Sequence, residues 1–135
     1  MMRLEELFDL EAIDEIVGLY APWDAAAARE LLELFAADAH HSLVRIRVSA
    51  WLGDAASLRH EANRLKGASG SIGATRLETE CIALERCAEG DLGELVGLEE
   101  RIEYAFSVLQ ETREALRNPA LYRKARGCSN IQTAT

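Results

Sequence analysis

The sequence lacks the features that mark fibrous, disordered and membrane-spanning chains. It has only 2 Pro and 9 Gly among 135 residues, which excludes collagen-like and proline-rich classes. No apolar run approaches the ~18 to 20 residues that span a bilayer. Residues 1–16 turn acidic at once and contain no hydrophobic secretory segment. We therefore expect a compact cytoplasmic protein with no membrane association.

Cysteine is also scarce. Cys81, Cys87 and Cys128 are odd in number and lack Cys-x-x-Cys spacing, so the sequence predicts neither a disulfide framework nor a zinc site. The histidines likewise lack ligand spacing such as His-x-x-x-His. We expect buried or incidental thiols, no metal and no cofactor.

Positive charge is in deficit overall but not locally. The net charge of -8 and the pI of about 4.9 argue against general binding to nucleic acid or anionic lipid. Residues 43–76 nevertheless carry a net charge of +4, and the remainder carries -12. This region could dock an acidic partner; the alternative is an ordinary solvated helix face.

What is present is helical periodicity in a chain that is 49% hydrophobic and long enough for one domain with a real core. Proline and glycine signals divide it into helices of about 10–19, 24–51, 55–71, 75–89 and 92–116, with no convincing strand. The long second helix should bury a stripe of Ala28, Leu31, Leu32, Phe35, Ala39, Leu43, Ile46 and Ala50.

Short connections between long amphipathic helices predict an all-α fold, an up-and-down antiparallel four-helix bundle with an additional short N-terminal helix. The bundle should occupy residues 1–118. Residues 119–135 should form a disordered C-terminal tail; the alternative is that Leu121 and Tyr122 pack back onto the bundle.

The segment 59–74, RHEANRLKGASGSIGA, carries the clearest local signal. With about 100° of turn per residue, its buried stripe should comprise Leu58, Ala62, Leu65, Ser69 and Ile72. Asn63 then points outward, with Gly67 and Gly70 on the same side and Lys66 on the flank. Because glycine costs a helix up to ~1 kcal/mol, these glycines suggest close approach by another molecule; the alternative is a loose helix end.

This segment resembles the signature of histidine phosphotransfer (HPt) domains, Ala-His-x-Leu-Lys-Gly followed by small residues and Gly-Ala. The signature is matched at Ala62, Leu65, Lys66, Gly67, Gly73 and Ala74, and Asn63 stands where the histidine is expected. The resemblance extends over most of the chain, from Phe8-Asp9 to Leu84-Glu85.

The resemblance implies that residue 63 is the phosphoacceptor position, that Lys66 helps to neutralise the phosphate, and that Gly67 gives clearance to a receiver domain. Imidazole has a basic nitrogen that attacks phosphorus. The amide nitrogen of Asn63 does not, because its lone pair is delocalised into the carbonyl. We therefore expect no phosphotransfer through residue 63 and no enzyme activity. His60, one turn earlier, is the substitute to consider, although Lys66 and Gly67 are in register with residue 63.

The sequence thus predicts a monomeric HPt-like protein of a two-component phosphorelay. Its partners would be response-regulator receiver domains, including those of hybrid sensor kinases, and it would act as a competitor or adaptor. The predicted receiver-binding residues are His60, Asn63, Arg64, Lys66, Gly67 and Gly70. Two alternatives stay open: a genuine phosphotransfer protein carrying a His-to-Asn change at position 63, and a non-catalytic helical scaffold with no receiver partner.

Overall fold

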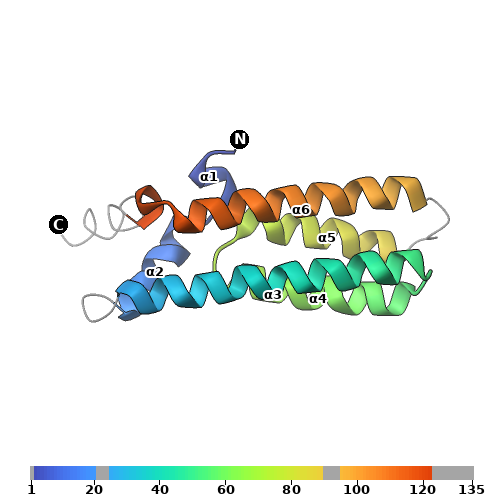
Figure 1. Cartoon of the computed structure of the whole chain (residues 1–135), viewed down its shortest axis with the longest axis horizontal. Helices are drawn as coiled ribbons and strands as arrows, with labels where there is room; N and C mark the ends of the chain where they lie inside the picture. The colour runs from blue at the N-terminus through green and yellow to red at the C-terminus, as the bar shows by residue number, and fades with distance from the viewer. Residues whose placement is uncertain (1, 21–24, 90–94, 123–135) are drawn as a thin grey trace.

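The computed structural model describes residues 2–20, 25–89 and 95–122, and this part of the chain contains helices and no strand (Figure 1). In chain order the helices are α1 (Leu4–Leu7), α2 (Leu10–Tyr20), α3 (Ala25–Trp51), α4 (Ala55–Ser71), α5 (Thr75–Glu89) and α6 (Leu95–Arg117). A further helical turn covers residues 119–122. Among the described residues, no helix is both long and apolar enough to cross a membrane.

Helices α3 to α6 form the predicted antiparallel four-helix bundle. Helices α3 and α5 each contact both α4 and α6, so the four helices close a ring around one core (Figure 1). Helix α2 packs against α3, and α1 packs against α5. The prediction of one short N-terminal helix was incomplete, because α1 has only four residues and is too short to show helical periodicity.

The core lies between the inner faces of these four helices. On α4, the predicted residues Leu58, Ala62, Leu65 and Ser69 are buried, and Ile72 is half-buried. On α3 the predicted stripe is buried except at Phe35, which is half-buried, and at Leu31, which is 40% exposed. Leu31 precedes the fully buried Leu32, and neighbouring residues on a helix point about 100° apart. The two adjacent leucines therefore do not both point into the core.

The chain continues to pack on the bundle beyond residue 118. Leu121 is fully buried, and the Tyr122 hydroxyl donates a hydrogen bond to the Leu116 carbonyl at 2.6 Å. These two residues pack back on the bundle, as the alternative prediction had it. The rest of the predicted tail, residues 123–135, lies outside the described residues.

The turn between α3 and α4 has the predicted glycine and aspartate signals. Gly53 ends α3 with a positive φ of 69°, a conformation that favours glycine. The Asp54 carboxylate caps α4 by accepting hydrogen bonds from the Ser57 backbone N–H at 3.1 Å and the Ser57 hydroxyl at 2.7 Å. These bonds lower the pKa of Asp54. The start of α4, and with it the position of Asn63, is thereby set.

Gly73 makes the turn between α4 and α5, where the first residues of α2 also meet it. Its φ is 77°, and a side chain there would place Cβ 2.7 Å from the Ala12 Cβ. The Gly73 carbonyl accepts a hydrogen bond from the Asp9 N–H at 2.8 Å. Gly73 is therefore required both by its own backbone conformation and by the close approach of α2.

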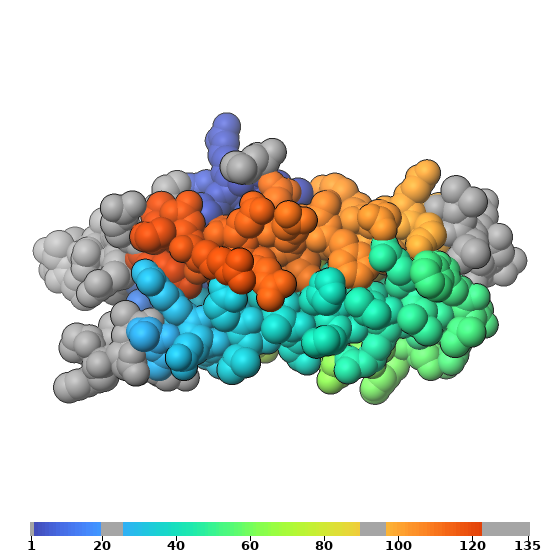
Figure 2. Space-filling view, in the orientation of Figure 1, coloured from blue at the N-terminus to red at the C-terminus, as the bar shows by residue number. Residues whose placement is uncertain are grey.

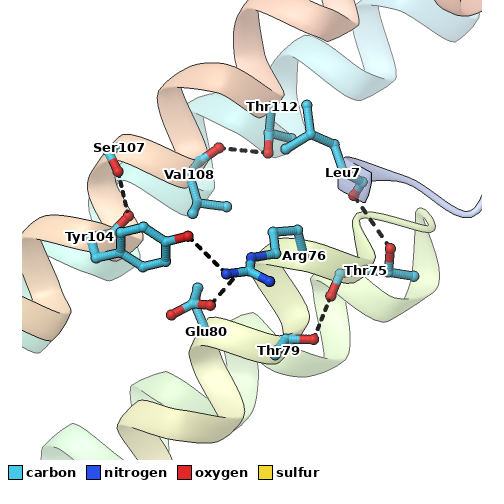
Figure 3. Close-up of polar contacts among 9 residues, drawn as sticks. All are labelled: Leu7, Thr75, Arg76, Thr79, Glu80, Tyr104, Ser107, Val108 and Thr112. Carbon is cyan, nitrogen blue, oxygen red and sulfur yellow. Dashed lines mark hydrogen bonds and ion pairs between the residues drawn. The ribbon is translucent and has the colours of Figure 1, made fainter. Parts of the chain in front are cut away.

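Polar contacts on the side of α5 away from α4 tie α1, α5 and α6 together (Figure 3). The Arg76 guanidinium donates a hydrogen bond to the Tyr104 hydroxyl of α6 at 2.8 Å and pairs with Glu80 at 3.5 Å. The Thr75 hydroxyl donates to the Leu7 carbonyl at 3.4 Å. Arg76, which belongs to the basic region of the sequence, is thus paired with α6 and with Glu80.

Gly73 and Gly67 should respond in opposite ways to the same substitution. Gly73→Ala should lower the free energy of unfolding by about 1–3 kcal/mol, because alanine is strained at positive φ and would contact α2. Gly67→Ala should raise it by up to ~1 kcal/mol, because Gly67 is helical with no atom within 4 Å of a Cβ. Urea unfolding measures both, and equal effects would contradict this account of the turn.

Candidate functional site around Asn63

Helix α4 presents an exposed row of residues on the side away from the core. Asn63 is exposed, as predicted, and so are His60 and Gly67. No heavy atom lies within 4 Å of the place where a Cβ of Gly67 would stand. In the orientation of Figure 2, α3 and α6 cover the near side of the molecule and α4 emerges only at its lower edge.

Glu85, on α5, joins two of the predicted site residues. Its Oε2 accepts a hydrogen bond from Lys66 Nζ at 2.8 Å, and its Oε1 accepts one from Asn63 Nδ2 at 3.2 Å. Only 18% of the Glu85 side chain is exposed, against 32% for Lys66. One carboxylate therefore engages both residue 63 and the lysine next to it.

The pKa of Glu85 lies below its ordinary value for the same reason. The hydrogen bond from Lys66 is the largest cause, and the bond from Asn63 and the charges of Lys66 and Arg59 act in the same direction. Burial opposes this shift without cancelling it. Glu85 is therefore ionised at neutral pH, and the charge of Lys66 already has a partner within the chain.

Glu85 was not among the site residues predicted from the sequence. A usable signal existed, because Asn63 and Glu85 lie at similar distances along the chain from the turn at Gly73. Residues placed in this way face each other across an antiparallel helical hairpin. To predict the contact, one also needs the rotation of each helix about its own axis, and that rotation depends on packing.

Two other predicted site residues, Arg64 and Gly70, lie against other side chains of the bundle. Arg64 faces α3, where its Nη2 donates a hydrogen bond to the Ser42 hydroxyl at 3.1 Å and its Nε lies 3.5 Å from Glu61. Gly70 is half-buried, and a Cβ there would collide with the Glu78 carboxylate of α5. The expectation of uncovered backbone therefore holds at Gly67 and is wrong at Gly70.

Two hollows lie beside the exposed row of α4. The first, of about 530 Å³, runs between α3 and α4 and is lined by Val44, Arg45, Val48, Ser49, Ala56, Ser57, His60 and Glu61. Val44 and Val48 are 41% and 44% exposed. The second, of about 410 Å³, is lined by Ala56, Arg59, His60, Asn63 and Glu85. His60 borders both, so an apolar groove and a polar hollow meet at this residue.

The basic region of the sequence does not form one patch. Arg47 turns towards α6, where it pairs with Glu99 at 3.4 Å and with Glu103 and lies over the Phe106 ring. Arg76 also turns towards α6. Arg45 and Arg64 lie within 4.0 Å of Glu61, and Lys66 lies 2.8 Å from Glu85. Arg59 lines the hollow beside Asn63.

The cysteines and the remaining histidines lie away from Asn63 in the sequence. Burial raises the pKa of Cys81 to about 12, so its thiol stays protonated. Cys87 is half-buried, and Cys128 lies outside the described residues. Within these residues no group of three or more His, Cys, Asp or Glu side chains could hold a metal ion. His40 and His41 are exposed on α3, as predicted.

Comparison with known proteins identifies the class of this bundle. The model of the Hpt domain matches residues 30–119, so the chain belongs to the Hpt domain family, which acts in two-component phosphorelays. The solved structure of histidine-containing phosphotransfer protein B from Pseudomonas aeruginosa PAO1 is similar, with a TM-score of 0.70 and 26% identity. The match covers 82% of this chain and 90% of that one. A comparison with curated proteins finds no match.

The carboxyl group of Glu85 should titrate below the ordinary pH range of a glutamate, and Lys66→Met should move its pKa upwards. Because the folded pKa is below the unfolded one, the contribution of this contact to stability is fully present above the unfolded value of about 4.3. It is lost as the pH falls through the lower folded value.

Carbon-detected NMR titration of the side-chain carboxyl measures the pKa directly. Unfolding of the wild type and of Glu85→Gln at several pH values gives the corresponding stability difference, which should shrink on acidification. An identical Glu85 titration in the wild type and in Lys66→Met would contradict the assigned cause.

Proposed function

We propose that this protein binds response-regulator receiver domains through the face around Asn63 and acts as a competitor or adaptor that does not relay phosphate. One observation carries the proposal. In a bundle of the Hpt family, the outward-facing residue of the signature helix is Asn63, and the backbone beside it at Gly67 is uncovered. Such a surface keeps room for a partner and offers no nucleophile to it.

The proposed docking face consists of His60, Asn63 and Gly67 on α4 together with Val44 and Val48 on α3. The half-exposed valines give this face apolar area, and the groove between the two helices makes it concave. Arg59 lines the hollow beside Asn63, and its positive charge complements the acidic active site expected of a receiver. Apolar area with a polar rim is the usual composition of a specific interface.

The chemistry of residue 63 supports the absence of phosphotransfer. An asparagine amide donates and accepts hydrogen bonds, but it has no basic lone pair for attack on phosphorus. In this chain its Nδ2 donates one hydrogen bond to Glu85. His60 is the nearest imidazole. The Lys66 ammonium, which would assist phosphoryl transfer, pairs with Glu85 and not with His60.

The first test is a titration of the chain with a panel of purified receiver domains from the organism that encodes it. We expect at least one to bind the wild type and to bind Gly67→Leu at least tenfold more weakly, because a side chain at Gly67 would obstruct the docking face. Ser107→Leu is a matched control: it adds similar bulk at an exposed position on α6 and should bind like the wild type.

Circular dichroism and urea unfolding establish that both variants fold. If no receiver binds in either the free or the phosphorylated form, the proposal is wrong and a scaffold without receiver partners becomes the better account. Equal weakening by Gly67→Leu and Ser107→Leu would move the binding site away from Asn63.

Reversion to histidine separates a diverged adaptor from a phosphotransfer protein that carries a recent His-to-Asn change. We expect Asn63→His to gain phosphate from a phosphorylated receiver slowly at best, because transfer requires the attacking nitrogen to be placed to within about an angstrom, and a diverged adaptor has had no need to keep that placement. Asn63→Ala is the control for background label. Rapid labelling of Asn63→His would show intact relay chemistry and favour the recent change.

A further inference from the structure

Apolar side chains stay exposed along the outer face of α3. The large apolar residues that are exposed in the described part of the chain are Leu19, Leu31, Leu34, Val44, Val48, Trp51, Leu52 and Tyr104. All but Leu19 and Tyr104 belong to α3 or directly follow it. Figure 2 shows α3, coloured cyan to green, along the near side of the molecule. Such a concentration on one helix is typical of an interaction surface and not of scattered surface residues.

The outer face of α3 has the residue spacing of a coiled-coil seam. This outer seam consists of Leu34, Ala37, His41, Val44, Val48 and Trp51, whose positions alternate in steps of three and four. Such alternation keeps one face of a helix against a second helix over several turns. With its opposite face α3 already packs into the bundle, where Leu32, Leu43 and Ile46 are fully buried. The outer seam is therefore a second helix-packing face, and the described residues place no helix on it.

The charge beside the outer seam changes sign along α3. Asp38 is exposed, and the side chain of Arg45 is 53% exposed although it lies 3.9 Å from Glu61. Asp38 and Arg45 lie on the same flank of the helix, because seven residues make almost two full turns. Asp38 precedes His41, at the middle of the seam, by three residues, and Arg45 follows it by four. The two opposite charges are thus nearly symmetric about His41.

We propose that the outer seam binds a second copy of this chain, with the two α3 helices antiparallel and a two-fold axis at His41. This arrangement brings the same flank of both helices together, so Asp38 of each copy lies opposite Arg45 of the other. It also places Leu34 of each copy against Val48 of the other. A parallel arrangement would instead bring like charges to the same height on the two helices.

A second copy fits this surface because the seam is complementary to itself. A symmetric dimer uses the same patch twice, and α3 supplies both halves of each apolar and each charged contact. Val44 and Val48 also belong to the proposed docking face, so a second copy and a receiver compete for the same area. A monomer was predicted from the sequence, in which the exposure of these α3 side chains is not visible. The dimer is an inference beyond receiver binding and does not depend on it.

Sedimentation equilibrium of the full chain measures this association. We expect the mass to rise with protein concentration from 14.9 kDa towards twice that value. Leu34→Glu should raise the dissociation constant about tenfold or more, because the dimer would then bury two carboxylates in an apolar contact. Leu19→Glu is the matched control, since it makes the same change at a residue of α2 that is 77% exposed. It should dimerise like the wild type.

Charge exchange tests the antiparallel arrangement. Asp38→Arg and Arg45→Asp should each raise the dissociation constant about three- to tenfold, because each turns two attractions into two repulsions. The double variant should return to within about twofold of the wild type. The two single variants change the net charge in opposite directions, so net charge does not account for a loss in both.

Circular dichroism establishes that each variant folds. The mass of a single chain at every concentration up to about 1 mM would overturn the inference and leave receiver binding untouched. Equal weakening by Leu34→Glu and Leu19→Glu would overturn it as well. A dimer that the double charge variant weakens more than either single variant does would overturn the antiparallel pairing of Asp38 with Arg45.

Discussion

The turn at Gly73 is the constraint on which the rest of the structure depends. Its left-handed backbone lets α4 reverse directly into α5, and its missing side chain lets the start of α2 close over the turn. Because the turn is short, it fixes the axial register of α4 against α5. That register places Glu85 opposite Asn63 and Lys66, so one glycine determines the electrostatics of a surface several helical turns away.

Glu85 gives the lysine of the signature, Lys66, a partner within the chain. From the sequence alone, a lysine beside an exposed residue 63 suggests an unpaired ammonium group that is available to bind a phosphate. In this chain the ammonium already has a carboxylate partner, and the same carboxylate holds the amide of Asn63. The proposal of recognition without phosphotransfer rests on residue 63 itself, since an asparagine amide is not a nucleophile.

Much of this could be predicted from the sequence, because it depends on local signals. Helix periodicity, the cap at Asp54 and the outward direction of Asn63 follow from neighbouring residues alone. Three features were missed. Helix α1 is too short to show periodicity. The other two depend on tertiary packing: Gly70 abuts Glu78 of α5, and Glu85 reaches residue 63 across the contact between α4 and α5. Local patterns fix which way a side chain points, and packing decides what it meets.

The central claim is that the chain recognises a receiver and takes no phosphate from it. The most direct measurement incubates the unaltered protein with a receiver that carries a radiolabelled phosphoryl group, while complex formation with the same receiver in its unphosphorylated form is followed in parallel. The account predicts a measurable complex and no label on the chain at any time. Label that appears on the chain, mapped by mass spectrometry to His60 or to any other residue, would contradict it.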